Sequence, residues 1–227
     1  MKKALVLSSG GTDSTTCLAM AVEELGAENV STVIIQYGQR HSKEVECARK
    51  IADHYGVAHY EFDLSDMFKY SDCALLSKST KDIVHDTYEH QVEAGTKITS
   101  YVPFRNGLML SVCATLAQSL WEYDQVDVYL GNHQSDFAYA DCSTDFVKKM
   151  NAAIEEGTYG MVHFVSPLKE MSKQEVIAKG LELNAPYELT WSCYEGHEKS
   201  CGKCASCLER LAAFEANGVE DPIAYEE

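Results

Sequence analysis

The sequence predicts an α/β fold, in which a parallel sheet carries helices on both faces and a small C-terminal extension follows. Apolar, β-branched runs alternate with segments of helical spacing along the chain, and the first run leads through two adjacent glycines into a helix. Strands that alternate with helices pair in parallel through right-handed crossovers. The 227 residues are enough for one such domain with an appendage.

The strands are predicted from short runs that are rich in apolar and β-branched residues, each bounded by polar or turn-forming positions. The first run, KALVLSS, has the character of a buried strand, and NVSTVIIQYG is strongly β-branched. The predicted strands span residues 2–8, 29–38, 58–64, 125–131 and 162–168.

The helices are predicted from apolar spacing together with start and stop signals. Gly26, Gly56 and Gly218 mark C-terminal ends, and Ser172 with Glu175 forms a capping box at a start. The predicted helices span residues 14–25, 42–55, 106–121, 143–156 and 172–183, with a final helix that ends at Asn217. Residues 65–104 are polar and weakly periodic, and we interpret them as a long active-site loop with one helix.

Composition restricts the classes of partner. The formal net charge is −16 and no Lys/Arg cluster is present, which disfavours a nucleic-acid partner and favours a small-molecule substrate. No run of 18 apolar residues occurs, so no membrane span is expected. The lysines at positions 2 and 3 precede an apolar run that is too short for a signal peptide, and we therefore expect a cytoplasmic enzyme.

The turn after the first strand reads Ser9-Gly10-Gly11-Thr12-Asp13-Ser14. A glycine-rich turn at a helix N-terminus presents free backbone N–H groups to an anion. Neither GxxxxGK[ST] nor GxGxxG is present. The turn instead resembles the SGGxDS loop of the PP-loop ATP pyrophosphatases, which transfer AMP from ATP to a substrate oxygen. The expected ATP-binding residues are Ser8, Ser9, Gly10, Gly11, Thr12, Asp13, Ser14, Thr15, Thr16, Cys17 and Leu18.

The sequence allows two interpretations of Asp13. Its carboxylate could help to hold Mg²⁺, which prefers oxygen ligands, or it could favour the helix dipole from the first turn. Lys173, next to the capping serine, could reach phosphate or could be a solvated first-turn lysine.

Four of the nine cysteines cluster near the C-terminus with the spacing C-x7-C-x2-C-x2-C. These are Cys193, Cys201, Cys204 and Cys207. Four thiolates suit a tetrahedral structural Zn²⁺ site. An iron–sulfur cluster and free or redox thiols are the alternatives, although the ferredoxin continuation x3-C-P is absent.

Polar residues at the ends of predicted strands, or at a helix start, are candidates for substrate contact. Arginine offers a planar fork for carboxylate or phosphate, whereas Asn106 could merely cap the helix that follows it. The candidates are Arg40, Arg105, Asn106, His133, Asp136 and Asp141, with His41 as a further possibility for ATP or substrate.

In combination, these stretches resemble the 7-cyano-7-deazaguanine synthase family of the PP-loop group. The matching segments are SGGTDSTTCL, YGQRHSKE, VPFRNGLML, the Asp141-Cys142 pair, TWSCY and CGKCASCLERLAAF, which together span residues 8–214. The family often has proline before the Asp-Cys pair, where this chain has Ala140, and this puts the rigidity of that loop in doubt.

The resemblance implies a Rossmann-like fold of the adenine nucleotide alpha hydrolase type, with a nucleotide-binding domain over residues 1–185 and a zinc-binding region over residues 186–227. It implies an ATP-dependent carbon–nitrogen ligase that acts on 7-carboxy-7-deazaguanine and ammonia, with catalytic roles for Asp13, Ser14 and Lys173, zinc on the four cysteines, and a homodimer. A tRNA thiolase, a synthetase-type amidase and a non-catalytic zinc protein are the rival interpretations.

Overall fold

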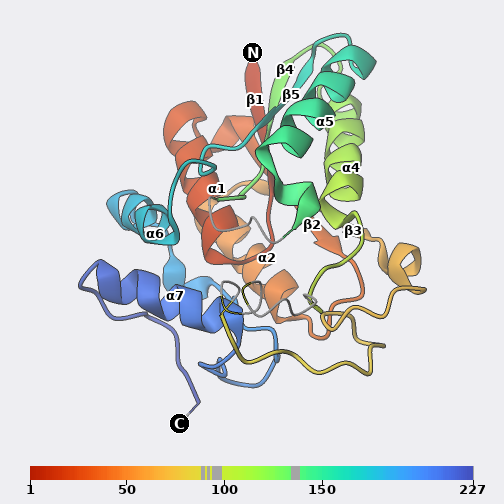
Figure 1. Cartoon of the computed structure of the whole chain (residues 1–227). Coiled ribbons are helices and arrows are strands. Elements are labelled where there is room, and N and C mark those ends of the chain that lie inside the picture. Colours follow the sequence, from red (N-terminus) through yellow and green to blue (C-terminus); the bar gives the residue numbers. More distant parts are fainter. Residues whose placement is uncertain (88–89, 91–92, 94–98, 134–138, 227) are drawn as a thin grey trace.

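A parallel five-stranded sheet forms the centre of the molecule (Figure 1). The computed structural model describes residues 1–87, 90, 93, 99–133 and 139–226. The strand order is β3-β2-β1-β4-β5, and every neighbouring pair is parallel. The strands are β1 (Lys2–Leu7), β2 (Val30–Gln36), β3 (Ala58–Asp63), β4 (Gln125–Tyr129) and β5 (Val162–Val165). The predicted α/β class and all five predicted strands are confirmed.

Helices cover both faces of this sheet (Figure 1). One face carries α1 (Thr12–Leu25), α2 (Lys43–Tyr55) and α6 (Lys173–Glu182), and the other carries α4 (Arg105–Leu120) and α5 (Thr144–Gly157). Successive side chains of β1 point to opposite faces of the sheet, so the core is divided in two. Ala4 and Val6 pack with Leu18 on one face, and Leu5 packs with Leu110 on the other. The last helix, α7 (Ala205–Ala216), packs on α6.

Helix boundaries follow the local signals with small shifts. The capping box of Ser172 and Glu175 is present, and Gly56 ends α2 in the left-handed conformation. Helix α1 begins at Thr12, two residues earlier than predicted, because Gly11 already occupies the cap position. Helix α4 begins at Arg105, and its cap residue Phe104 has a φ of 51°.

The predicted long loop over residues 65–104 contributes to the core as well as to the surface. It begins with a short 3₁₀ helix over Ser65–Phe68. Leu75, Leu76 and Val102 are buried in the cluster that packs under α4. The loop is therefore partly held by apolar contacts, and residues 88–89, 91–92 and 94–98 of it lie outside the described part of the chain.

The C-terminal region joins the rest of the molecule through a shared core cluster. Tyr187 and Phe214 pack against Ala19 of α1 and Ile177 of α6. The proposed division after residue 185 stays a prediction, since this cluster includes residues from both sides of it.

Arg210 of α7 ties the C-terminal tail to this cluster. Its Nε and one terminal nitrogen donate to the two carboxylate oxygens of Asp221, at 2.7 and 2.8 Å, and the other terminal nitrogen donates to Thr190 Oγ1 at 2.7 Å. The side chains of Arg210 and Asp221 are only 1% and 3% exposed. The ion pair is therefore bidentate, buried and hydrogen-bonded to further groups.

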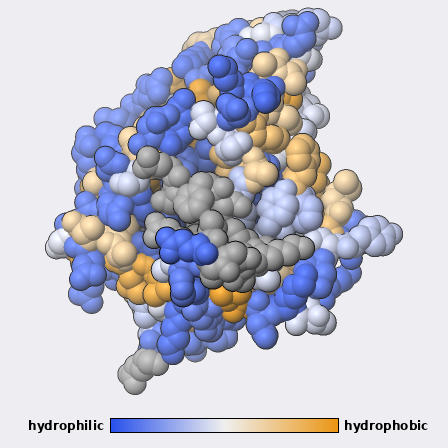
Figure 2. Space-filling model, in the orientation of Figure 1, coloured by the Kyte–Doolittle hydropathy of each residue, from blue (hydrophilic) through white to orange (hydrophobic). Residues whose placement is uncertain are grey.

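Among the described residues, no helix has the length and apolar character needed to cross a membrane. On the face shown in Figure 2, hydrophilic residues cover most of the coloured surface, and hydrophobic residues occupy smaller separate areas.

The turn between β1 and α1 is in close contact with the first turn of α2. Gly10 has a φ of 79°, and a methyl group there would collide with the carbonyl oxygen of Glu44. Gly131, after β4, approaches the other side of the turn, because a methyl group there would lie 3.1 Å from the backbone nitrogen of Ser14. Gly10 therefore requires a residue without a side chain, whereas a side chain at Gly131 would require a small shift of its neighbours.

We expect Gly10→Ala to lower the free energy of unfolding more than Gly56→Ala. Both glycines have positive φ, at 79° and 65°, but a methyl group at Gly56 would have no neighbour within 4 Å. Backbone strain alone should cost about 1 kcal/mol at Gly56, and overpacking should add about 1–3 kcal/mol at Gly10. Urea unfolding of the two variants measures the difference, and equal losses would show that the contact with α2 is unimportant.

We expect Asp221→Ala to lower the free energy of unfolding by about 3–5 kcal/mol, because it leaves the buried Arg210 charge without its partner. Glu182→Ala is the matched control, since Glu182 pairs with Lys179 at 3.0 Å on the surface of α6. An exposed pair of this kind contributes less than about 0.5 kcal/mol. Urea unfolding followed by circular dichroism separates the two cases, and similar losses would contradict a structural role for the buried pair.

Candidate active site and cysteine cluster

A cavity of about 250 Å³ lies where β1, β2 and β4 end. The order of strands reverses between β1 and β4, so the loops that follow these strands diverge and leave a crevice, as is typical of open α/β sheets. The cavity wall includes Ser8, Ser9, Gly11, Thr12, Asp13 and Ser14 from the β1–α1 loop. It also includes Tyr37, Glu44, Arg105, Asn106, Asn132, His133, Tyr139, Asp141, Lys173, Trp191 and Tyr194.

The β1–α1 loop is held by its own hydroxyl groups. Ser14 Oγ accepts from the backbone nitrogen of Ser9 at 3.2 Å and lies 3.1 Å from Ser9 Oγ. Ser14 Oγ and Thr15 Oγ1 both donate to the carbonyl of Gly11, at 3.2 and 2.7 Å. These bonds hold the loop in one shape at the N-terminus of α1, where unpaired N–H groups and the helix dipole favour an anion.

One hydroxyl in this loop lacks a partner. Thr12 Oγ1 is buried and has no hydrogen-bond partner in the described part of the chain. Because an unsatisfied buried polar group is costly, a hydroxyl in this position fits a ligand that accepts a hydrogen bond there, such as a phosphate oxygen.

Asp13 and Lys173 form an ion pair at the edge of the loop. Lys173 Nζ donates to both carboxylate oxygens of Asp13, at 2.6 and 2.7 Å, and His133 Nε2 lies 3.8 Å from the same carboxylate. Burial opposes the ionisation of Asp13, but Lys173 and His133 outweigh it and hold the pKa below its usual value. Lys173 is only 7% exposed, so it is a buried site residue rather than a solvated lysine.

This geometry bears on the two interpretations of Asp13. The carboxylate lies in the first turn of α1, where it favours the helix dipole. Both of its oxygens are engaged by Lys173, and the arrangement therefore favours a role in holding the lysine over a direct role as a Mg²⁺ ligand.

Asn106 does not cap α4, because that position belongs to Phe104. Its backbone nitrogen donates to Asp141 Oδ2 at 2.8 Å, and its side-chain nitrogen donates to the carbonyl of Asp141 and to Cys142 Sγ, at 3.3 and 3.0 Å. Asp141 therefore satisfies a free N–H group at the start of α4. The Asp-Cys pair lies in a single 3₁₀ turn, Ala140–Cys142, which Ser143 closes through its hydroxyl group.

Arg105 lies beside Asn106 on the cavity wall. Its guanidinium is 5.3 Å from the centre of the Tyr37 ring, and its Nε lies 3.4 Å from Asn106 Oδ1. The planar group is thus supported from one side by an aromatic ring, which suits a cation that binds carboxylate or phosphate.

The structure brings most of the predicted site residues together, but not all. Arg40 lies outside the cavity, where its guanidinium donates to the carbonyls of Ala74 and Lys81. The hydroxyl groups of Thr16 and Tyr187 are hydrogen-bonded at 2.7 Å. Cys17 and Leu18 are buried in the core cluster between α1 and the sheet. Asp136 lies outside the described residues.

Sequence reasoning missed several residues of the cavity wall, among them Tyr37, Glu44, Trp191 and Tyr194. Tyr37 and Glu44 flank the predicted candidates Arg40 and His41, and Trp191 and Tyr194 flank the first cysteine of the cluster. Their proximity to those candidates was the available signal. Burial raises the pKa of the Glu44 carboxyl to about 7, although Arg105 acts in the opposite direction.

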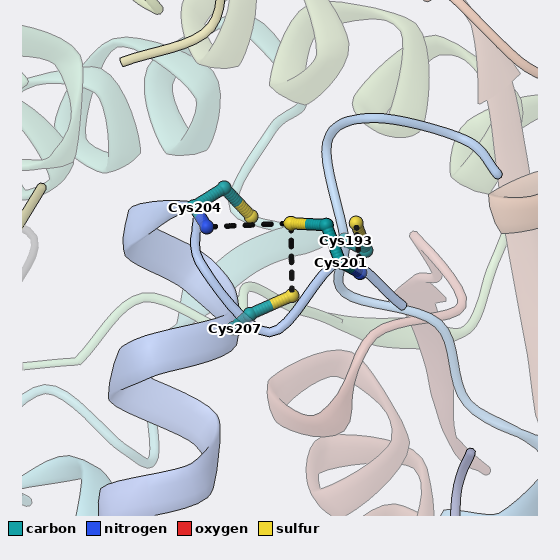
Figure 3. A group of neighbouring side chains, drawn as sticks. All are labelled: Cys193, Cys201, Cys204 and Cys207. Atoms are coloured by element: carbon teal, nitrogen blue, oxygen red, sulfur yellow. Dashed lines mark hydrogen bonds between the residues drawn. The ribbon is translucent and has the colours of Figure 1, made fainter. Parts of the chain in front are cut away.

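The four clustered cysteines point toward one another from a loop and the start of α7 (Figure 3). All four are buried and none forms a disulfide. Their sulfur atoms lie within 4.8 Å of one another, and tetrahedral coordination with Zn–S bonds of about 2.3 Å would require sulfur separations of about 3.8 Å. Backbone nitrogens of Cys201 and Cys204 donate to cluster sulfurs at 3.3 Å. The set fits a closed four-sulfur metal site.

The segment that leads to this cluster is bonded directly to the β1–α1 loop. The backbone nitrogen of Trp191 donates to the carbonyl of Gly10 at 2.9 Å, and its indole nitrogen donates to the carbonyl of Cys193 at 2.8 Å. His41 lies 3.1 Å from the same Cys193 carbonyl, and Lys43 Nζ lies 4.3 Å from the centre of the Trp191 ring. Trp191 thus joins the cysteine cluster, α2 and the predicted phosphate loop.

Comparisons with known proteins agree with this architecture. A 7-cyano-7-deazaguanine synthase of Pseudoalteromonas atlantica is 42% identical over 228 residues, which cover 100% of each chain. Another from Psychromonas ingrahamii is 39% identical over 227 residues, or 100% of this chain and 99% of that protein. The solved NMN synthetase from Francisella tularensis has a TM-score of 0.50 at 12% identity, covers 96% of this chain and 77% of that one, and shares the fold alone.

The family described as "Queuosine biosynthesis protein QueC" matches residues 3–218, which is nearly the whole chain. This match and the full-length relatives confirm the resemblance that the motifs indicated, and the chain belongs to the QueC family.

Proposed function

We propose that this chain is an ATP-dependent 7-cyano-7-deazaguanine synthase, which converts 7-carboxy-7-deazaguanine and ammonia into the nitrile in queuosine biosynthesis. The observation that carries the proposal is full-length similarity to proteins of that name, at 39–42% identity. The cavity supports it, because its lining includes both a phosphate-type loop and Arg105.

ATP would bind with its phosphates at the β1–α1 loop. The N–H groups at the start of α1 and the hydroxyls of Ser9 and Thr12 are suitable donors to phosphate oxygens, and Ser14 holds the loop that carries them. Lys173, held by Asp13, would lie beside the phosphates and balance the charge that develops on pyrophosphate. Mg²⁺ would accompany the phosphates.

The other wall of the cavity would position the acid. Arg105 would bind its carboxylate, and Asn106, with Asp141 behind it, would support the start of α4 beside the substrate. His133 lines the same cavity, with its Nε2 3.8 Å from the Asp13 carboxylate of the β1–α1 loop. These assignments place the carboxylate and the α-phosphate in one cavity, and catalysis then rests mainly on positioning and charge neutralisation.

The reaction balances as two rounds of adenylation. In the first, a carboxylate oxygen attacks the α-phosphorus and pyrophosphate leaves; ammonia then attacks the acyl carbon, and AMP leaves as the amide forms with loss of a proton. In the second, the amide oxygen attacks a second ATP and pyrophosphate leaves. The carbon–oxygen bond then breaks, AMP takes the oxygen, and loss of both N–H protons leaves the C≡N bond. One loop serves both rounds, because both attacks occur at the α-phosphorus.

We also propose that the cysteine cluster binds zinc. Four thiolates fill all positions of a tetrahedral site, and such a site is structural rather than catalytic. Cys193, Cys201, Cys204 and Cys207 would hold the ion, and the bound metal would stabilise the segment that carries Trp191. An iron–sulfur cluster is the alternative for the same ligands.

The homodimer, the cytoplasmic location and the absence of a nucleic-acid partner stay predictions. The net charge of −16 supports the last of them, since a tRNA-binding enzyme needs a basic surface. Sulfur transfer to tRNA by the purified protein would favour the rival thiolase interpretation.

We expect the purified protein, given ATP, Mg²⁺, ammonium and 7-carboxy-7-deazaguanine, to form the nitrile together with AMP and pyrophosphate. Mass spectrometry of the products measures this directly. Ser14→Ala removes a hydroxyl that holds the loop and should weaken ATP binding about tenfold, since one hydrogen bond contributes about 1 kcal/mol or slightly more. Ser119→Ala, on the surface of α4, is the control. Amide without nitrile would confine the activity to the first round.

We expect Cys204→Ser to lose the metal, to unfold at a lower temperature and to bind ATP more weakly, because the cluster supports the Trp191–Gly10 hydrogen bond. Cys47→Ser is the control, since Cys47 of α2 packs against the cluster without being one of its four ligands, and this variant should retain the metal. Elemental analysis of both variants and of the parent protein measures the metal. Iron with a visible absorption band in the parent protein would overturn the zinc proposal.

A further inference from the structure

The cavity wall contains a carboxyl group to which the reaction described above gives no role. Glu44 is the second residue of α2, and its half-buried side chain lines the cavity. Its carboxylate has no hydrogen bond or ion pair with any residue that the structure describes. A half-buried carboxylate that lines a cavity and has no protein partner can accept hydrogen bonds from a ligand that supplies donors.

The other carboxyl groups on the described wall are already engaged. Asp13 accepts from Lys173 through both oxygens, and Asp141 accepts from the backbone nitrogen of Asn106. Glu209 also has an interaction partner. Glu44 is therefore distinguished, within the described wall, by having both oxygens available.

The backbone of Glu44 is held firmly in place. Its carbonyl oxygen packs against Gly10 so closely that no side chain fits between them. The preceding residue, Lys43, bonds to the carbonyls of His197 and Glu198 and lies against the Trp191 ring. A carboxyl group on so constrained a turn can select a ligand by geometry, because little freedom is lost when the ligand binds.

The charge that Glu44 senses most directly comes from Arg105. Burial raises the pKa of Glu44 to about 7, and Arg105 is the group that opposes this rise. Glu44 and Arg105 line the same cavity, so its wall presents both a hydrogen-bond acceptor and a hydrogen-bond donor, with the Tyr37 ring 5.3 Å from the guanidinium. A flat heterocycle that carries donors on one edge and acceptors on another would satisfy both.

The 7-deazaguanine ring has this distribution. Its pyrimidinone edge presents N1–H and the 2-amino group side by side as two donors, whereas O6 and the 7-carboxylate are acceptors. A carboxylate accepts two such parallel donors, and an arginine fork binds carboxylate oxygens.

We propose that Glu44 is the specificity-determining residue for the ring, accepting hydrogen bonds from N1–H and the 2-amino group while Arg105 holds the carboxylate. This inference rests on the proposed function. It assigns Glu44 to recognition of the heterocycle, and leaves the activation of the acid to the β1–α1 loop and Lys173.

The test compares two ligands on two variants by equilibrium calorimetry. The ligands are 7-carboxy-7-deazaguanine and the analogue that has hydrogen in place of the 2-amino group. Glu44→Gln replaces one acceptor oxygen by a donor without changing the size of the side chain. Asp53→Asn, an exposed carboxyl-to-amide change on the same helix, is the matched control.

The parent protein and Asp53→Asn should bind the guanine-type ligand at least about 100-fold more tightly than the analogue, because a site built around a substrate N–H leaves its acceptor unpaired when that group is missing. Glu44→Gln should bind the guanine-type ligand about 10- to 100-fold more weakly and lose most of this discrimination, with ATP affinity and metal content unchanged. Binding does not require turnover, so a parent protein that discriminates without forming nitrile would contradict the proposed function but not this inference.

Two results would overturn the inference. If Glu44→Gln keeps the full discrimination between the two ligands, the ring is read by another group. If it loses affinity for ATP and for both ring ligands in the same proportion, Glu44 supports the fold of the first turn of α2, as a helix N-terminal carboxylate would.

Discussion

Gly10 is the point at which three separate parts of the chain meet, and the geometry of the cavity depends on that contact. The β1–α1 loop supplies the glycine, the first turn of α2 packs against it through the carbonyl of Glu44, and Trp191 donates a hydrogen bond to its carbonyl at 2.9 Å. Because Trp191 is bonded in turn to Cys193, the cysteine cluster is mechanically linked to the phosphate loop about 180 residues earlier in the chain. A metal held by the four cysteines would therefore influence the proposed binding of ATP without contacting it.

The charges that matter to the site are local and differ from the overall charge. The chain carries a formal net charge of −16, yet the described part of the cavity wall carries the cations Lys173 and Arg105, and each is held by neighbours. Asp13 partly neutralises Lys173 before any ligand binds, so phosphates would compete with a carboxylate for an already positioned ammonium group. The ion pair offsets the free-energy cost of burying the Lys173 ammonium group and orients that group toward a bound anion. The net charge therefore bears on the binding of large charged partners, whereas the buried ion pair bears on the binding of a small-molecule ligand.

Local sequence signals accounted for most of the fold and for the phosphate-type loop. The β-branched runs, the glycine stops and the capping box at Ser172 each act within a few residues, and each appears where it was predicted. The candidate site was predicted less completely. Arg40 follows a strand as a ligand-binding residue would, but it turns to the carbonyls of Ala74 and Lys81, because the long loop packs beside it. Asn106 stands at a helix start as a cap would, but it bonds to Asp141 from another strand's loop. In both cases, hydrogen bonds to a segment distant in the sequence determine where the side chain lies.

The sequence by itself determined the parallel α/β class, the order of its elements, the glycine-rich turn and the four-cysteine set, because these depend on periodicity, on turn chemistry and on the spacing of like residues. Only the tertiary structure decided which polar side chains share a cavity. It paired Lys173 with Asp13 across 160 positions, brought Trp191 to Gly10 and left the Glu44 carboxylate facing the crevice without a partner in the described chain. These long-range contacts depend on the strand order and on helix packing. Both arise from the burial of apolar faces over the whole chain rather than from any short segment.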